Sequence, residues 1–376
     1  MLLEMDCNRA LLIAQIMAIM VSVGGCSQYE PLDETLIIRE ELDARMPAEL
    51  AAQVVVPYEL DETVRQDVEA RLNPSGSERR RTEEILDFVF GGIDLRYSLT
   101  PTRNAVETYY TREGNCLSFV NLFVAIGRLQ RLNPFYVEVE DYQRWNYHEG
   151  VVVSRGHIVA GMYVDGELST FDFLPYQPKA YRDFEPITDL QAIAHYYNNL
   201  GAEALMGGDL EEANGDLQIA ASLAPDFDKA VNNLGIVYLR TGETTRAIEL
   251  YRRSLELHPD NVPLMTNLAR AYQQEGEVEA AKELLERLEE SNEANPFFYV
   301  YRGDLALADD DLETALRYMR KAYRTDSNLP EVHVGLVRVY LALGNFKQAR
   351  HHVERALKLD ATHEEARKYA AMLAQR

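Results

Sequence analysis

Residues 228–261 read DKAVNNLGIVYLRTGETTRAIELYRRSLELHPDN, and residues 262–295 read VPLMTNLARAYQQEGEVEAAKELLERLEESNEAN. The two stretches align without a gap, because Asn, Leu, Gly and Ala recur at their sixth, seventh, fifteenth and twentieth positions. On either side of the glycine the apolar residues have helical spacing. A unit of two helices that repeats at a fixed period indicates a solenoid in which neighbouring helix pairs stack on one another.

The same period continues through the whole C-terminal half. Its units span residues 194–227, 228–261, 262–295, 296–329 and 330–363 without an insertion. The seventh position is leucine in every unit except the fourth, which has Arg302, and Asp310 replaces the glycine of the fifteenth position once. The twentieth position, where a small side chain lets two helices cross closely, is always alanine: Ala213, Ala247, Ala281, Ala315 and Ala349. The pattern resembles the tetratricopeptide repeat (TPR). This resemblance implies five repeats in an all-α superhelix, a capping helix over residues 364–376 and a groove that binds a protein or peptide.

Two sets of side chains are candidates for contacting a ligand in that groove. Asn199, Asn233 and Asn267 share the sixth position of the first three units. In TPR proteins that bind extended peptides, such a row clamps the peptide backbone, although asparagine is also simply common at this position. Arg240 and Arg270 add positive charge to an acidic array, which favours an acidic ligand group. The alternative is that both arginines are solvated surface cations.

The N-terminus has the features of an export signal. A mostly apolar run over residues 10–24 is too short to span a bilayer and ends in Val23-Gly24-Gly25-Cys26. That tetrad resembles the lipobox of bacterial lipoproteins. The resemblance implies that residues 1–25 are a signal peptide and that Cys26 is acylated, with palmitate among its chains, and anchors the protein to a membrane. Ser27 after the cysteine implies the periplasmic face of the outer membrane. The alternative is an uncleaved apolar helix.

Charge and cysteine content narrow the possible partners. The 38 Lys and Arg residues face 61 Asp and Glu residues, giving a net charge of −23, so we expect no nucleic acid partner. The lipobox resemblance implies that processing removes Cys7 and that lipid occupies Cys26, which would leave Cys116 as the one thiol among the three cysteines. A lone thiol in an oxidising compartment calls for a function. The oligomeric state is left open.

The region before the repeats has mixed α and β character. Residues 26–75 are acidic and rich in proline, so we interpret them as a tether and a loosely packed lead-in with a short helix over residues 34–44. Residues 76–190 are predicted to form a separate domain. Within it, residues 81–90 and 119–129 have helical spacing, and residues 135–140 alternate like a strand. The fold class is therefore α+β followed by an all-α array.

Cys116 and a downstream hairpin supply a candidate catalytic set. Gly114-Asn115-Cys116 leads into the apolar helix, and a helix N-terminus favours a thiolate. A strand begins at His157, and Asp165-Gly166 predicts a two-residue hairpin turn. With that turn Val159 opposes Asp172, which makes Asp172 a diagonal neighbour of His157 on one face. A three-residue loop would instead turn Asp172 to the other face.

These residues resemble the transglutaminase-like superfamily of papain-like fold, over roughly residues 81–186. The resemblance implies that Cys116 attacks an amide or ester carbonyl, that His157 accepts the thiol proton, and that Asp172 orients the imidazole. The Cys116 amide would be one oxyanion donor, with Asn104, Tyr109 and Tyr110 as candidates for a second. The product is a hydrolysed peptide, a deamidated glutamine or a cross-link.

Several alternatives accompany this interpretation. His148 is a rival base, predicted to lie in a loop that no aspartate-bearing strand follows. A second hypothesis is that the transglutaminase-like domain is a scaffold that has lost turnover and only binds proteins. We find no histidine and carboxylate cluster with metal-ligand spacing, no glycine-rich phosphate loop and no serine-nucleophile elbow. We therefore expect neither a metal nor a cofactor.

Overall fold

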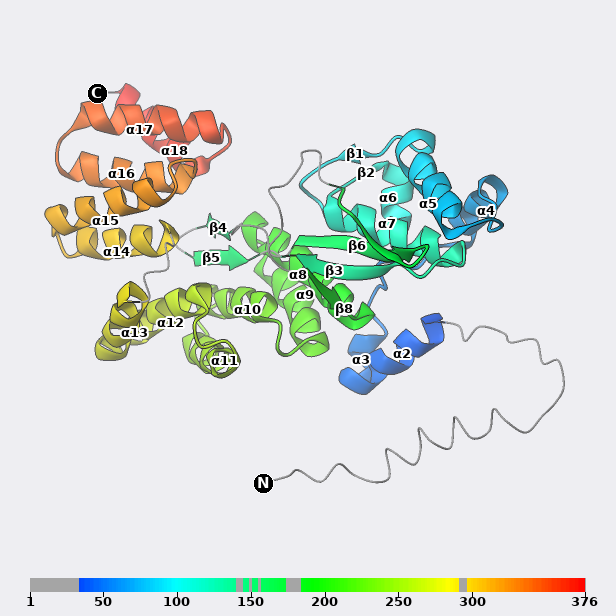
Figure 1. Cartoon of the computed structure of the whole chain (residues 1–376). Helices are drawn as coiled ribbons and strands as arrows, with labels where there is room; N and C mark the ends of the chain where they lie inside the picture. Colours follow the sequence, from blue (N-terminus) through cyan, green and yellow to red (C-terminus); the bar gives the residue numbers. More distant parts are fainter. Residues whose placement is uncertain are drawn as a thin grey trace.

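The computed structural model describes residues 34–139, 145–148, 151–154, 157–173, 184–290 and 296–375. The proposed signal peptide and Cys26 lie outside these residues. Figure 1 shows a mixed α and β domain, coloured blue to green, followed by helix pairs coloured green to red. No helix in the described part of the chain is long and apolar enough to cross a bilayer.

The N-terminal domain combines short helices with a small antiparallel sheet. Its helices are α2 (Glu34–Arg45), α3 (Ala48–Ala51), α4 (Glu62–Arg71), α5 (Glu78–Asp87), the π-helical η2 (Phe88–Gly92), α6 (Ala105–Thr111) and α7 (Cys116–Leu129). The sheet has the order β7 (Glu167–Phe171), β6 (His157–Val164), β3 (Phe135–Val139) and β8 (Phe184–Ile187). Two further pairs are β1 (Arg96–Tyr97) with β2 (Glu113–Gly114), and β4 (Trp145–His148) with β5 (Val151–Ser154). The expected helices and the strand near residue 135 are all present.

Helix α7 is the centre of this domain, because it packs against the sheet through β6. Phe123 and Ile126 of α7 are fully buried, as its strongly apolar sequence predicts. Alternate residues of β6, among them Ile158, Ala160 and Met162, belong to the same core. Val159, between them, is buried in a second cluster with Val137 and Val139 of β3, so both faces of this strand are covered. The helix that begins at Cys116 is thereby fixed against the strand that begins at His157.

The expectation of a loosely packed lead-in is wrong for residues 37–72. Helix α2 occupies the predicted position, but Leu42 on this helix and Val64 and Val68 on α4 are fully buried. They belong to the same apolar core as α7. The acidic, proline-rich composition concealed this role, because the apolar residues are few and are buried on one face only.

The repeat array follows the predicted period closely. Its helices are α8 (Asp189–Gly207), α9 (Leu210–Leu223), α10 (Asp228–Arg240), α11 (Thr244–Leu257), α12 (Val262–Glu275), α13 (Val278–Glu290), α14 (Pro296–Ala308), α15 (Leu312–Thr325), α16 (Pro330–Ala342), α17 (Phe346–Leu359) and the cap α18 (Glu364–Ala374). The second to fifth pairs begin at the residues predicted. The first begins earlier, because the segment from Asp189 already belongs to α8.

The fifteenth position of each unit requires a left-handed backbone. Gly208, Gly242, Gly276 and Gly344 have φ values between 69° and 86°, and Asp310 adopts 58° in the fourth unit. Glycine tolerates this region without the steric cost that a Cβ atom brings. The alanines of the twentieth position are all buried to 1% exposure or less, as close helix crossing requires.

The domain and the first repeat share one core. This apolar cluster runs from α2 through α7 to the α9–α10 junction. Arg128 at the end of α7 donates two hydrogen bonds, of 2.7 and 2.8 Å, to Asp189 at the start of α8. Glu138 on β3 pairs with His195 on α8 at 3.4 Å and with Lys229 on α10. The connection between the two parts is thus a continuous packed helix.

Candidate functional site

The loop before α7 places Cys116 at the first helical position. The Asn115 side chain caps the helix by accepting a hydrogen bond of 3.0 Å from the Ser118 amide. A Cβ atom on Gly114 would lie 2.5 Å from the Ser118 Cβ atom, so the close approach of β2 to α7 requires glycine. Cys116 itself is half-buried and has a free thiol. The positive end of the helix dipole lies beside its sulfur.

The hairpin has the register that the sequence predicts. Val164 pairs with Glu167 and Ala160 pairs with Phe171, across a two-residue turn in which Asp165 and Gly166 have φ values of 53° and 84°. Positive φ at both turn residues is typical of the tight hairpin turn that Asp-Gly favours. Asp172 follows directly after β7, which brings its side chain to the end of the sheet where β6 begins at His157.

His157 lies between the carboxylate and the thiol. Its Nε2 atom is 3.3 Å from Asp172 Oδ1, and the two side chains are 12% and 18% exposed. Burial by itself lowers the pKa of this imidazole. The hydrogen bonds and charges of Asp172 and Cys116 outweigh burial and raise the pKa from 6.5 to about 9. A pKa near 9 keeps this imidazole mainly protonated at neutral pH.

The candidates for a second oxyanion donor have other partners. Tyr109 donates a hydrogen bond to Asp67 on α4, and Tyr110 donates one of 3.3 Å to Asp61 at the start of that helix. The Asn104 side chain caps α6 in a capping box with Glu107. All three are thus engaged in holding helices α4 and α6. The rival base His148 lies in β4, outside the residues whose side chains the structure describes.

The asparagine row lies inside the array. Asn233 donates a hydrogen bond of 2.8 Å to Asn198, and Asn267 donates one of 2.8 Å to Asn232. These bonds join the first helices of successive repeats. Asn199 is 7% exposed, and its Oδ1 atom has no hydrogen-bond partner among the described residues. The bonds of Asn233 and Asn267 favour a structural role in helix pairing for these two residues, and the role of the row in clamping a peptide stays a prediction.

The two arginines proposed to contact a ligand, Arg240 and Arg270, differ in their surroundings. Arg240 donates a hydrogen bond of 3.0 Å to the Leu205 carbonyl, which ties the second repeat to the first. Arg270 lies on α12, half-buried, and its charge lowers the pKa of Tyr301 against the raising effect of burial. Strand β5 of the N-terminal domain packs against α10 and α12, so the β4–β5 pair covers part of these two helices (Figure 1).

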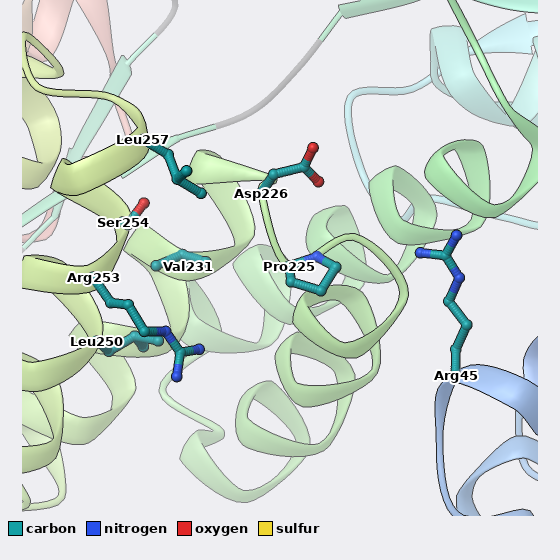
Figure 2. A pocket seen from close by; sticks show the side chains of 8 residues that line it. All are labelled: Arg45, Pro225, Asp226, Val231, Leu250, Arg253, Ser254 and Leu257. Carbon is teal, nitrogen blue, oxygen red and sulfur yellow. The ribbon is translucent and has the colours of Figure 1, made fainter. Parts of the chain in front are cut away.

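A surface depression of about 540 Å³ lies apart from the thiol, where α2 meets the second repeat. Figure 2 shows its lining side chains: Arg45, Pro225, Asp226, Val231, Leu250, Arg253, Ser254 and Leu257. Arg45 crosses this junction with a hydrogen bond of 3.0 Å to the Leu223 carbonyl. The depression therefore marks the junction of domain and array. Within the described residues, no group of three or more His, Cys, Asp or Glu side chains is placed to hold a metal ion.

Two polar contacts near Cys116 escaped prediction from the sequence. Thr102 bonds to the Asn115 side chain and to Glu203, which lies on α8. Asn115 itself had a detectable signal, since asparagine before an apolar helix is a typical cap. Thr102 and Glu203 are 101 residues apart, and no local pattern links them.

Comparison with known proteins concerns the C-terminal half alone. Family models described as tetratricopeptide repeat match residues 198–262 in one case and residues 238–296 and 306–375 in another. No curated protein matches the chain at a significant level.

Solved structures resemble the same half at low similarity. The TPR protein TTC0263 of Thermus thermophilus is 20% identical with a TM-score of 0.44, covering 48% of this chain and 99% of its own. MamA from Desulfovibrio magneticus RS-1 is 22% identical with a TM-score of 0.32, covering 46% and 97%. A TPR protein from Parabacteroides merdae ATCC 43184 is 20% identical with a TM-score of 0.34, covering 48% and 72%. The family models, together with the unbroken period, establish that the C-terminal half is a TPR array, a type of domain that generally binds protein partners.

Proposed function

We propose that this protein is a membrane-anchored cysteine hydrolase or acyltransferase of transglutaminase-like fold, in which the TPR array recruits a protein substrate or partner. The observation that carries the proposal is the 3.3 Å contact between His157 and Asp172, with the Cys116 thiol near enough to the same imidazole to raise its pKa. Acyl transfer through a thioester requires a nucleophile next to a base, and the base next to a carboxylate that orients it.

The chemistry assigns one step to each side chain. The Cys116 thiol gives its proton to His157, and the sulfur attacks the carbonyl carbon of an amide. The Cys116 backbone amide donates to the oxygen of the tetrahedral intermediate. As the C–N bond breaks, His157 returns the proton to the leaving amine, and a thioester remains. Water then releases an acid, or a second amine takes the acyl group. Asp172 keeps the imidazole oriented through both steps.

The proposed activity is tested by the reactivity of Cys116 in a chain that begins at Ser27. We expect iodoacetamide to modify the parent rapidly at pH 7, and His157→Asn to slow the reaction about tenfold or more, because the imidazolium no longer stabilises the thiolate. His351→Asn, which changes an exposed imidazole on α17, is the matched control. Equal rates in the parent and His157→Asn would overturn the proposal.

The membrane anchor is proposed from the lipobox at Cys26. In bacterial cells supplied with labelled palmitate, the full-length chain should incorporate label and sediment with the outer membrane. Cys26→Ala should do neither, whereas Cys7→Ala should behave like the parent. Equal labelling of the Cys26→Ala chain would refute acylation at this residue.

A second candidate is a scaffold whose domain binds proteins without turnover. It is compatible with the family models, which match the protein-binding repeats. Formation of hydroxamate from a glutamine-containing peptide and hydroxylamine separates the two candidates. Product that depends on Cys116 supports the enzyme. Unactivated Cys116, with neither hydrolysis nor transfer, supports the scaffold.

A further inference from the structure

We propose that Glu203, on the first helix of the TPR array, is a positioning residue for Cys116 and acts on it through Thr102 and Asn115. The inference rests on the proposed Cys116–His157 pair. It adds that a residue of the first repeat sets the geometry of the thiol in the neighbouring domain.

A continuous chain of hydrogen bonds joins the two parts. The Asn115 Oδ1 atom accepts bonds of 3.0 Å from both the Ser118 amide and the Ser118 hydroxyl. The Asn115 Nδ2 atom donates one of 2.7 Å to the Thr102 hydroxyl oxygen. That hydroxyl lies 2.8 Å from Glu203 Oε1, and the Thr102 amide lies 3.1 and 3.0 Å from the two carboxylate oxygens. Thr102, Asn115 and Ser118 are all buried, so water does not compete freely for these bonds.

The direction of these bonds follows from the chemistry of their groups. A carboxylate only accepts, so the single proton of the Thr102 hydroxyl points to Glu203. The Thr102 oxygen then has its lone pairs for the Asn115 amide, which must present Nδ2 to it. This leaves Oδ1 toward α7, where it accepts from the first turn. The opposite orientation of the Asn115 amide would place its NH₂ group against the Ser118 N–H, and the cap would be lost.

The cap is relevant to reactivity because Cys116 is the next residue. The Asn115 side chain fixes where α7 begins, and so it fixes the direction of the Cys116 sulfur relative to His157 and to the helix dipole. By bonding to Thr102 from the first repeat, Glu203 keeps the Asn115 side-chain amide in the orientation that caps α7. The packing of α8 against the N-terminal domain therefore helps to position Cys116.

Paired substitutions in the chain beginning at Ser27 test the inference. Glu203→Met removes the acceptor at similar volume, whereas Glu203→Gln keeps one acceptor oxygen. Thr102→Val removes the hydroxyl, whereas Thr102→Ser keeps it. We expect the Met and Val variants to be alkylated at Cys116 about fivefold more slowly at pH 7, with the rate profile displaced to higher pH. The Gln and Ser variants should recover most of the rate. Glu249→Met, at an exposed position on α11, is the control.

The outcomes separate this inference from the proposed function. A profile that stays unchanged in Glu203→Met and Thr102→Val, with only the unfolding temperature lowered, would mean a purely structural contact. Equal losses in the conservative and the disruptive variants would also overturn the inference. If His157→Asn displaces the profile and these variants do not, only the positioning role fails. If His157→Asn has no effect either, the Cys116–His157 pair itself is refuted.

Discussion

The imidazole of His157 offers the most direct measurement on the proposed site. Burial alone would lower its pKa from 6.5, but Asp172 and Cys116 raise it to about 9. In a chain beginning at Ser27, we predict that ¹H–¹⁵N spectra of the histidine rings show His157 protonated at pH 7.5. Asp172→Asn should lower its pKa, because the carboxylate charge that favours the imidazolium is then removed.

The same shift has a consequence for stability. Because the folded pKa lies above the unfolded value, the contribution of the protonated ring is fully present below pH 6.5 and is lost as the pH rises through about 9. A rise from 6.5 to about 9 corresponds to on the order of 3 kcal/mol. We expect urea unfolding at pH 6 and pH 10 to show this loss in the parent and not in His157→Asn. Glu167→Gln, an exposed carboxylate on β7, should keep it. A ring that titrates at or below 6.5 in the parent would refute the reasoning.

Three further predictions concern the structure around the site and in the array. Gly114→Ala should lower the free energy of unfolding by about 1–3 kcal/mol in urea titrations, since its Cβ atom would lie 2.5 Å from Ser118 Cβ. Gly91→Ala should change little, because an added Cβ atom there would meet no packed neighbour within 4 Å. Asp310→Gly should raise the thermal unfolding midpoint, with a gain of about 1 kcal/mol, because φ is 58° there; no gain from glycine would mean that the aspartate side chain compensates. Asp309→Gly is its control and should bring no gain. Arg128→Met should cost about 2–4 kcal/mol in urea titrations by leaving Asp189 without its double hydrogen bond. Arg80→Met, which removes an exposed ion pair with Glu84, should cost under about 1 kcal/mol.

Much of the array could be predicted from the sequence because its contacts are local. The pairs that begin at 228, 262, 296 and 330 start at the predicted residues, and Asp310 substitutes for glycine at a position with φ of 58°. Each repeat contacts mainly its neighbours, so the period in the sequence is also the period in space. The hairpin register was predictable for the same reason, since Asp165-Gly166 determines a two-residue turn wherever the hairpin lies.

The candidate site was predictable only in part. The cysteine at a helix start and the aspartate one residue beyond β7 follow from local pattern, and the contact of Asp172 with His157 follows from the register. The approach of Cys116 to the same imidazole was implied only by the family resemblance, because it depends on how α7 packs against β6. The hydrogen bonds of Tyr109 and Tyr110 were not predictable. Their carboxylate partners lie within or at the start of α4, in a segment whose composition indicated a tether. A buried face made of a few valines has too weak a signal to overcome acidic flanks.

By itself, the sequence determined the helix pairs, their boundaries and the order of Cys116, His157 and Asp172 along the chain. Only the tertiary structure decided that Asn233 and Asn267 bond to the first helix of the preceding repeat, that residues 37–72 complete the core, and that Glu203 reaches Thr102 across 101 residues. The physical reason is that helices, turns and repeats depend on residues near one another in the chain. The partner of a buried polar group is decided instead by which distant segments close the same core.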